Sequence, residues 1–164
     1  METVSLRTIC YALGFNATRP AKWIEDGYLT PSVPGGSSLD HELTKGDALS
    51  LLALADLDEA GLAPSHIYRE VQRLDRYQTR TCLVISTGHL GRLIPSTPRG
   101  GPGASDEDCT PVHMPGRLYH DIVPLDRMYE VLADKQRHVT IILNLDHLKD
   151  RVDEAWQRAA SEQP

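Results

Sequence analysis

Two short helices joined by a tight turn are predicted by the stretch Ser5–Leu29, SLRTICYALGFNATRPAKWIEDGYL. In its first half, apolar side chains recur at the i, i+3, i+4, i+7 spacing of one buried helical face. These residues are Leu6, Ile9, Cys10 and Leu13. Gly14 follows at a point where a helix commonly ends. The first helix is therefore expected to stop at this glycine.

The second half of the same stretch predicts another helix. Asn16 and Thr18 have side chains that can cap its N-terminus, and Pro20 is tolerated in a helix only in the first turn. Ala17, Ala21, Ile24 and the body of Trp23 can face the first helix. Arg19 and Lys22 then remain on the outer side together with Thr18. A helix, a tight turn and a helix with an exposed basic rim form the helix-turn-helix pattern.

Composition limits what this chain can be. Its 164 residues give room for one ordinary domain or two small ones, and 40% hydrophobic residues suffice for a packed core. The net charge of -6 is unusual for a nucleic-acid binder, so any contact with DNA must be local. Three cysteines cannot all pair, which disfavours a secreted disulfide framework. Without a signal or membrane-spanning pattern, we expect a cytoplasmic protein that is not bound to a membrane.

A hairpin or wing is predicted after Leu29. Ser32–Pro34 and Leu39–Leu43 can form two short extended segments around the Gly35-Gly36 turn. Thr44 then has the features of an N-cap, with Asp47 three residues later as a shortened capping box.

Two more helices are expected before the middle of the chain. The third follows Thr44 and ends at Gly61, and its leucines cover most of its circumference, which implies burial on more than one side. The fourth begins at Pro64 and runs to about Tyr77. Basic residues recur on one side of this fourth helix, opposite Ile67, Val71 and Leu74; they are Arg69, Arg73, Arg76 and Arg80. This basic stripe is either a solvated face or a contact for phosphate or a partner.

The second half of the chain predicts a small α/β unit. Short β-branched runs indicate strands at Cys82–Ser86, Leu118–Val123 and Val139–Leu145. A helix is expected at Leu125–Gln136, with Met128, Leu132 and Val131 turned inward, and a last amphipathic helix follows on Leu145 and packs on the sheet or on a second subunit. Between the first two strands, a segment near residues 95–117 is rich in proline and glycine and is expected to be a mobile loop.

The predicted fold class is therefore α+β, with two domains. Residues 1–78 would form a mainly α-helical winged helix-turn-helix. Residues 79–164 would form a dimerisation or effector unit with a short sheet and a C-terminal helix.

Residues 5 to about 75 resemble the N-terminal DNA-binding domain of MerR-family transcription regulators. The residues that carry the resemblance are Gly14, Trp23–Leu29 (WIEDGYL), Pro31, Thr44–Leu49 (TKGDAL) and Leu57–Leu62 (LDEAGL). The resemblance implies a winged helix-turn-helix whose second helix enters the major groove and a dimer on a two-fold operator. It ends near Tyr77, where many members of the family continue into a long dimerisation helix and this chain does not.

Contact with double-stranded DNA is predicted for Arg19 and Lys22 first, and then for Thr18, Arg7 and Lys45. Arginine can donate two hydrogen bonds to a guanine edge, lysine can bind a phosphate, and a hydroxyl at a helix start can reach a backbone oxygen. The carboxylates of Asp40 and Glu42 in the wing oppose binding by repulsion, so either the wing is held away from DNA or the affinity is low.

The predicted function is thus a transcription regulator that binds DNA as a homodimer, with RNA polymerase or another protein as a further partner. Two alternatives stay open: a winged-helix adaptor that binds another protein, and an excisionase-like architectural factor that bends DNA. Cys109, His113, His120 and His89 match no standard zinc spacing, so no metal is predicted. Ser86-Thr87-Gly88-His89 is neither a nucleophile elbow nor a phosphate loop, so neither an enzyme nor a cofactor is predicted.

Overall fold

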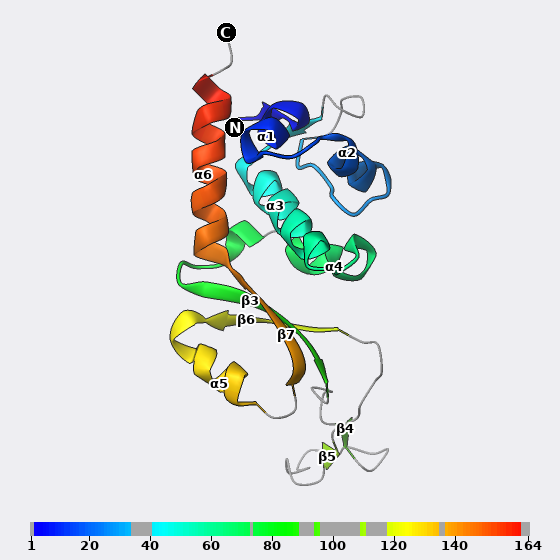
Figure 1. The fold of residues 1–164 in the computed structure, drawn as a ribbon, viewed down its shortest axis with the longest axis vertical. Helices are drawn as coiled ribbons and strands as arrows, with labels where there is room; N and C mark the ends of the chain where they lie inside the picture. Colours follow the sequence, from blue (N-terminus) through cyan, green and yellow to red (C-terminus); the bar gives the residue numbers. More distant parts are fainter. Residues whose placement is uncertain are drawn as a thin grey trace. The chain divides into compact units, whose positions relative to one another are not determined.

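The structure is a computed structural model that describes residues 2–33, 41–72, 74–88, 94–95, 109–110, 118–134 and 137–161. It has a mixed α+β architecture, as the sequence predicts, and it divides into two compact units (Figure 1). The first unit consists of Met1–Thr79 together with Asn144–Pro164, and the second consists of Arg80–Leu143.

Helices dominate the first unit. Its elements are β1 (Val4–Ser5), α1 (Leu6–Leu13), α2 (Thr18–Glu25), β2 (Glu42–Leu43), α3 (Lys45–Glu59), α4 (Pro64–Val71), the 3-10 turn η1 (Leu74–Arg76) and α6 (Leu145–Ser161). The two predicted N-terminal helices are confirmed as α1 and α2. Gly14 after α1 and Gly27 after α2 have φ angles of 87° and 78°, a left-handed conformation that glycine adopts without steric cost.

Helix α3 forms the centre of the first unit. Thr44 caps it through the predicted capping box, in which its hydroxyl accepts from the Asp47 amide and the Asp47 carboxylate accepts from the Thr44 amide. The helix is apolar on several sides and contacts β2, α4, η1 and α6. Fully buried side chains of this core are Leu6, Ile9, Leu43, Leu51, Leu52, Leu54, Leu57, Ile67 and Leu74.

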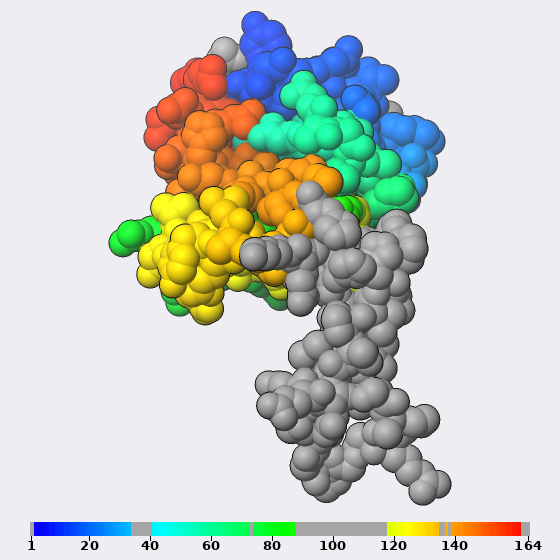
Figure 2. Space-filling view, turned by 60° about the horizontal axis from the view of Figure 1, so that its bottom comes forward, coloured from blue at the N-terminus to red at the C-terminus, as the bar shows by residue number. Residues whose placement is uncertain are grey.

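The C-terminal helix α6 packs alongside α1 and α3 (Figure 1). In the space-filling view its red C-terminal part borders the blue N-terminal residues (Figure 2). Its buried face consists of Leu145, Leu148, Val152, Ala155, Trp156 and Ala159. Arg151 donates to the Asp56 carboxylate of α3 at 2.5 Å, and Lys149 donates to the Tyr77 carbonyl at 2.8 Å. The predicted division into residues 1–78 and 79–164 is wrong for this helix, which belongs to the first unit and not to the second.

Strand β2 has a different partner from the one predicted for it in the wing. Val4 pairs with Leu43 and Ser5 with Glu42, so β2 forms an antiparallel ladder with β1 at the N-terminus. The expected hairpin partner, residues 32–34, forms no described strand, and the predicted Gly35-Gly36 turn lies outside the described residues. Backbone groups of β2 are satisfied by the strand that precedes α1, which ties the start of α3 to the start of α1.

The fourth helix is shorter than predicted. It ends at Val71, because Gln72 has an extended backbone with φ −68° and ψ 130°, and Leu74–Arg76 then form a separate 3-10 turn. The predicted basic stripe therefore does not share one helical face. Arg69 lies on α4 and donates from Nε to the Tyr68 hydroxyl at 3.0 Å, whereas Arg76 belongs to η1. Arg80 follows with a φ of 62°, and Arg73 lies outside the described residues.

The second unit contains a three-stranded sheet in the order β6-β3-β7. Its strands β3 (Thr81–Gly88), β6 (Tyr119–Pro124) and β7 (Arg137–Asn144) confirm the three predicted strands. Strand β3 pairs with β6 in an antiparallel register that joins Thr81 to Pro124 and Ser86 to Tyr119.

A short helix covers this sheet. After the 3-10 turn η3 (Leu125–Arg127), α5 (Met128–Ala133) packs Val131 against Cys82 and Val84, with Val123 and Met128 beside them. The predicted helix is thus confirmed in shorter form. Leu132 was predicted to point inward and does not, since it is 71% exposed. Within the expected loop near 95–117, β4 (Ile94–Pro95) pairs with β5 (Cys109–Thr110), and the expected mobility falls on residues outside those described.

We predict that Leu148→Ala, on the buried face of α6, destabilises the first unit by about 2–5 kcal/mol, because it leaves a cavity between α6 and its neighbours. Both tryptophans, Trp23 and Trp156, belong to this unit, so fluorescence during urea unfolding reports on it alone. The exposed Gln157→Ala on the opposite face of α6 is the control. Equal midpoints for the two variants would contradict the packing of α6 on the first unit.

Candidate functional site

The α1–turn–α2 segment is held in place by local hydrogen bonds. The Ser5 hydroxyl caps α1 by accepting from the Thr8 amide at 3.2 Å. The Asn16 side chain accepts from the Thr18 amide at 2.9 Å and satisfies a free donor at the start of α2. At the other end of α2, the carbonyl of Trp23 accepts from the amides of Tyr28 and Leu29. Both ends of α2 are therefore fixed by its own neighbours in sequence.

One face of α2 is buried and the other is exposed. Pro20, Ala21 and Trp23 are buried, which confirms that the aromatic ring belongs to the core. Arg19 and Lys22 lie on the outer face, where their side chains are 66% and 63% exposed. The two predicted DNA-contacting cations are thus on one helix, three residues apart and accessible to solvent.

Arg19 forms an ion pair with Asp58 near the end of α3. Its guanidinium also lies 5.8 Å from the centre of the Trp23 ring, within the range of a cation–π contact. The Asp58 side chain is only 9% exposed, so an exposed arginine is paired with a carboxylate that is largely shielded from solvent. Asp58 could not be predicted as the partner of Arg19, because no spacing rule connects residues so far apart in the chain.

Lys22 has acidic neighbours at the C-terminal end of α2. Its amine lies 3.0 Å from Asp26 and 3.8 Å from Glu25. The hydrogen bond with Asp26 is the main reason that the pKa of Lys22 is raised above its ordinary value, with a smaller contribution from Glu25. This amine therefore stays charged at neutral pH, and the two carboxylates compete with any external anion for it.

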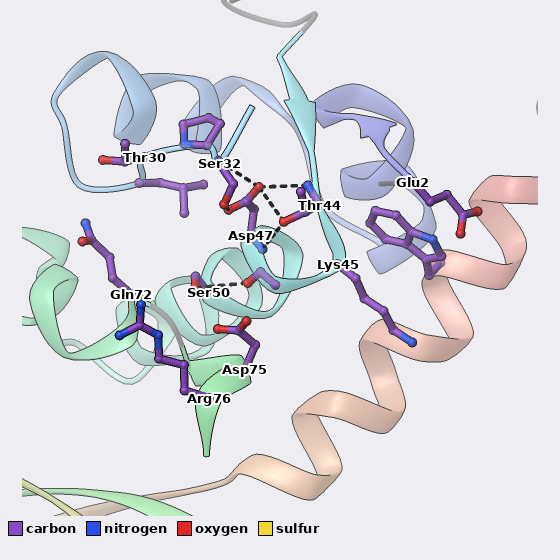
Figure 3. A pocket seen from close by; sticks show the side chains of 14 residues that line it. Glu2, Thr30, Ser32, Thr44, Lys45, Asp47, Ser50, Gln72, Asp75 and Arg76 are labelled. Carbon is purple, nitrogen blue, oxygen red and sulfur yellow. Dashed lines mark hydrogen bonds between the residues drawn. The ribbon is translucent and has the colours of Figure 1, made fainter. Parts of the chain in front are cut away.

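The other three predicted contact residues have different positions. Thr18 is exposed at the start of α2, where its hydroxyl donates to Asn16 at 2.8 Å. Arg7 is exposed on α1. Lys45 starts α3 and forms an ion pair of 2.6 Å with Asp153, and its amine points toward α6 in Figure 3. Thr18 thus joins Arg19 and Lys22 on α2, while Arg7 and Lys45 come from other helices.

Asp47 connects α3 to the segment that follows α2 (Figure 3). Its carboxylate accepts from the Ser32 amide at 3.1 Å and from the Ser32 hydroxyl at 2.7 Å. It also accepts from the amide and hydroxyl of Thr44 at 2.9 and 2.8 Å. Because the side chain is buried, these four hydrogen bonds replace its water shell. The chain that leads into the predicted wing is thus anchored to the start of α3, an interaction that sequence analysis did not foresee.

A polar groove of about 740 Å³ lies beside this carboxylate. Figure 3 shows the side chains that line it, which come from the segment after α2, from α3, from η1 and from α6. Its lining includes two cationic side chains, Lys45 and Arg76, and three carboxylates, Glu2, Asp47 and Asp75. Such a lining has one carboxylate more than it has cations and does not favour an anion.

The remaining chemical candidates have structural roles or lie outside the described residues. Ser86 is buried in the sheet, where its hydroxyl shares a hydrogen bond with Thr140 and accepts from Arg137 at 2.9 Å. In the described part of the chain, no group of three or more His, Cys, Asp or Glu residues can hold a metal ion. His89 and His113 are not among the described residues. None of the helices described is both long and apolar enough to cross a membrane.

Neither a family model nor a curated protein matches this chain. Its function is therefore inferred from the geometry of its own residues.

We predict that Asp47→Ala lowers the free energy of unfolding of the first unit by about 2–3 kcal/mol, since it leaves the donors of Ser32 and Thr44 without their charged acceptor. Thr44→Ala removes the hydroxyl that accepts from the Asp47 amide and donates to the Asp47 carboxylate but leaves the link to Ser32, and it is expected to cost about 1 kcal/mol. Urea unfolding followed by tryptophan fluorescence measures both. If the two substitutions cost the same, the link from Asp47 to Ser32 contributes nothing.

Proposed function

We propose that this protein is a DNA-binding transcription regulator that acts as a dimer on a two-fold operator. In this proposal, α1 and α2 form the helix-turn-helix and α2 enters the major groove. The observation that carries the proposal is the outer face of α2, where Arg19 and Lys22 are exposed while Trp23 and Ala21 fix the opposite face in the core.

The chemistry of this face fits a nucleic-acid contact. Arg19 has a planar guanidinium that can donate to the O6 and N7 atoms of guanine, and Lys22 can approach a phosphate as a compact positive charge. Thr18, at the first turn of α2, can donate its hydroxyl to a backbone oxygen. The rigid ends of α2 reduce the conformational entropy that binding would cost.

Carboxylates limit the strength of each contact. Asp58 must release Arg19, and Asp26 and Glu25 must release Lys22, before a phosphate can take their place. A single half-site is therefore expected to bind weakly. Two recognition helices on one dimer bind adjacent half-sites as linked events, and this raises the overall affinity without any new contact.

A second candidate is an adaptor that binds another protein through the same helices. The acidic partners of both cations favour it, because the paired surface is close to neutral and the whole chain has a net charge of -6. Bringing such a surface near a protein costs less electrostatic free energy than bringing it near a polyanion. The adaptor would retain its partner when Arg19 and Lys22 lose their charge, whereas a DNA contact would be lost.

We predict that the double substitution Arg19→Gln and Lys22→Gln lowers affinity for an operator duplex at least about a hundredfold, since base and phosphate contacts are lost together. The duplex is obtained by selection from a random pool and tested by gel shift. Arg127→Gln removes one exposed charge from the second unit and is the control for a change in net charge. Unaltered urea midpoints would show that the fold is intact, and retained operator affinity would place the DNA contact elsewhere.

We also predict that Asp58→Asn strengthens operator binding several-fold, because it frees Arg19 from its fixed carboxylate. Glu59→Gln removes the same charge at the next residue, which is exposed on the surface. Comparing the two by fluorescence anisotropy separates the release of Arg19 from a general reduction of negative charge. Equal gains for both variants would mean that the ion pair with Asp58 does not restrain the arginine.

A further inference from the structure

Strand β7 lies at one edge of the sheet in the second unit. Among the strands that the structure describes, the order β6-β3-β7 gives it one neighbour, β3, and no described strand pairs with its other side. Its eight residues, RHVTIILN, make it long enough for a continuous ladder. An edge of this kind is a template for strand addition unless charge or proline protects it.

The middle of β7 has neither a charged residue nor a proline. Val139–Leu143, VTIIL, contains no charged residue, and two of its apolar side chains are exposed, Val139 by 59% and Ile142 by 39%. Arg137, at the start of the strand, is bound by Asp121 at 3.1 Å and by Asp134 at 3.2 Å. Its charge is thus already matched within the same unit.

The opposite edge of the sheet is different. Strand β6 has His120 and Asp121 exposed on it and ends at Pro124, which has no amide hydrogen to donate. Charge and proline on an edge strand discourage further pairing. The sheet therefore has one edge suited to strand addition and one edge protected from it.

We propose that β7 pairs antiparallel with β7 of a second copy of this chain and so forms the dimer interface. In an antiparallel pair, residues directly opposite each other have their side chains on the same face of the sheet. A two-fold axis that is perpendicular to the sheet and relates the two β7 strands must therefore pass midway between one residue and the same residue of the other copy. The centre of the uncharged segment is Ile141. Placing the axis there sets Val139 opposite Leu143 and Thr140 opposite Ile142, and all five residues pair within the segment.

A second copy fits this edge better than an unrelated strand does. Two chains of net charge -6 repel each other, and they can approach most closely where neither has a charge, which is the segment Val139–Leu143. Once the two β7 strands have paired, both outer edges of the joined sheet are β6, so addition stops at two copies. This assignment depends on the second unit alone and would hold even if α2 did not bind DNA.

The test uses the full chain and measures its mass by sedimentation equilibrium at concentrations around 1–100 µM. We expect a dimer that Val139→Lys weakens at least about tenfold, because the new ammonium lies against apolar residues of the partner strand. Leu132→Lys makes the same change at an exposed residue of α5, away from the edge, and is expected to alter the dissociation constant less than about twofold. A monomer throughout this range, or a dimer that Leu132→Lys weakens as much as Val139→Lys does, would overturn the proposal.

A cross-linking measurement tests the register independently. Cys10 and Cys82 are buried, so a Cys109→Ser background with Ile141→Cys leaves one designed thiol for a short bismaleimide. We expect a covalent dimer from this variant and far less from Leu132→Cys in the same background. Preferential cross-linking at Leu132→Cys would overturn the pairing. The Arg19→Gln and Lys22→Gln variant should keep the dimer, which separates a failure of this interface from a failure of DNA binding.

Discussion

Helix α3 is apolar around most of its circumference, and the first unit depends on covering it from more than one side. α1 and α2 precede it and α4 follows it, but the chain returns only after the whole second unit to supply α6. Burial of Leu148, Val152 and Trp156 then completes the core. The ion pair between Arg151 and Asp56 fixes the position of α6 along α3. The first unit is consequently discontinuous in sequence, and its last helix supplies part of its core.

Electrostatic balance decides what the surface of this unit can bind. The exposed cations of α2 are each paired with a carboxylate, Arg19 with Asp58 of α3 and Lys22 with Asp26, the residue that follows α2. In any contact with DNA, these carboxylates would compete with phosphate for the two side chains. In the proposed regulator, a dimer would overcome this competition, since two weak contacts on one duplex reinforce each other. The uncharged edge of β7 offers the second unit a means of joining two copies in spite of their net negative charge.

Local signals in the sequence predicted local structure well. The spacing of Leu6, Ile9 and Cys10, the left-handed glycines and the capping box at Thr44 each depend on a few neighbouring residues. The fourth helix was predicted too long because no glycine or proline follows Pro64 before residue 78, and the break at Gln72 has no local signal. Leu74 packs beside α3 in a 3-10 turn, so tertiary contact determined where the helix ends.

Contacts between residues far apart in the chain could not be predicted, because the patterns in the sequence report only on neighbouring residues. An amphipathic face shows that α6 needs an apolar partner, but it does not show which one. The prediction that α2 has Arg19 and Lys22 on its outer face agrees with the structure, whereas the Arg19 partner Asp58 and the link from Asp47 to Ser32 could be found only from the fold.

The most direct test of DNA recognition is selection of bound duplexes from a random pool by the full chain, followed by sequencing and a salt titration. We expect an inverted repeat with half-sites about 10 base pairs apart and affinity that falls steeply with salt. Absence of any enriched motif, or retention that does not depend on salt, would contradict the proposed recognition of DNA by α2.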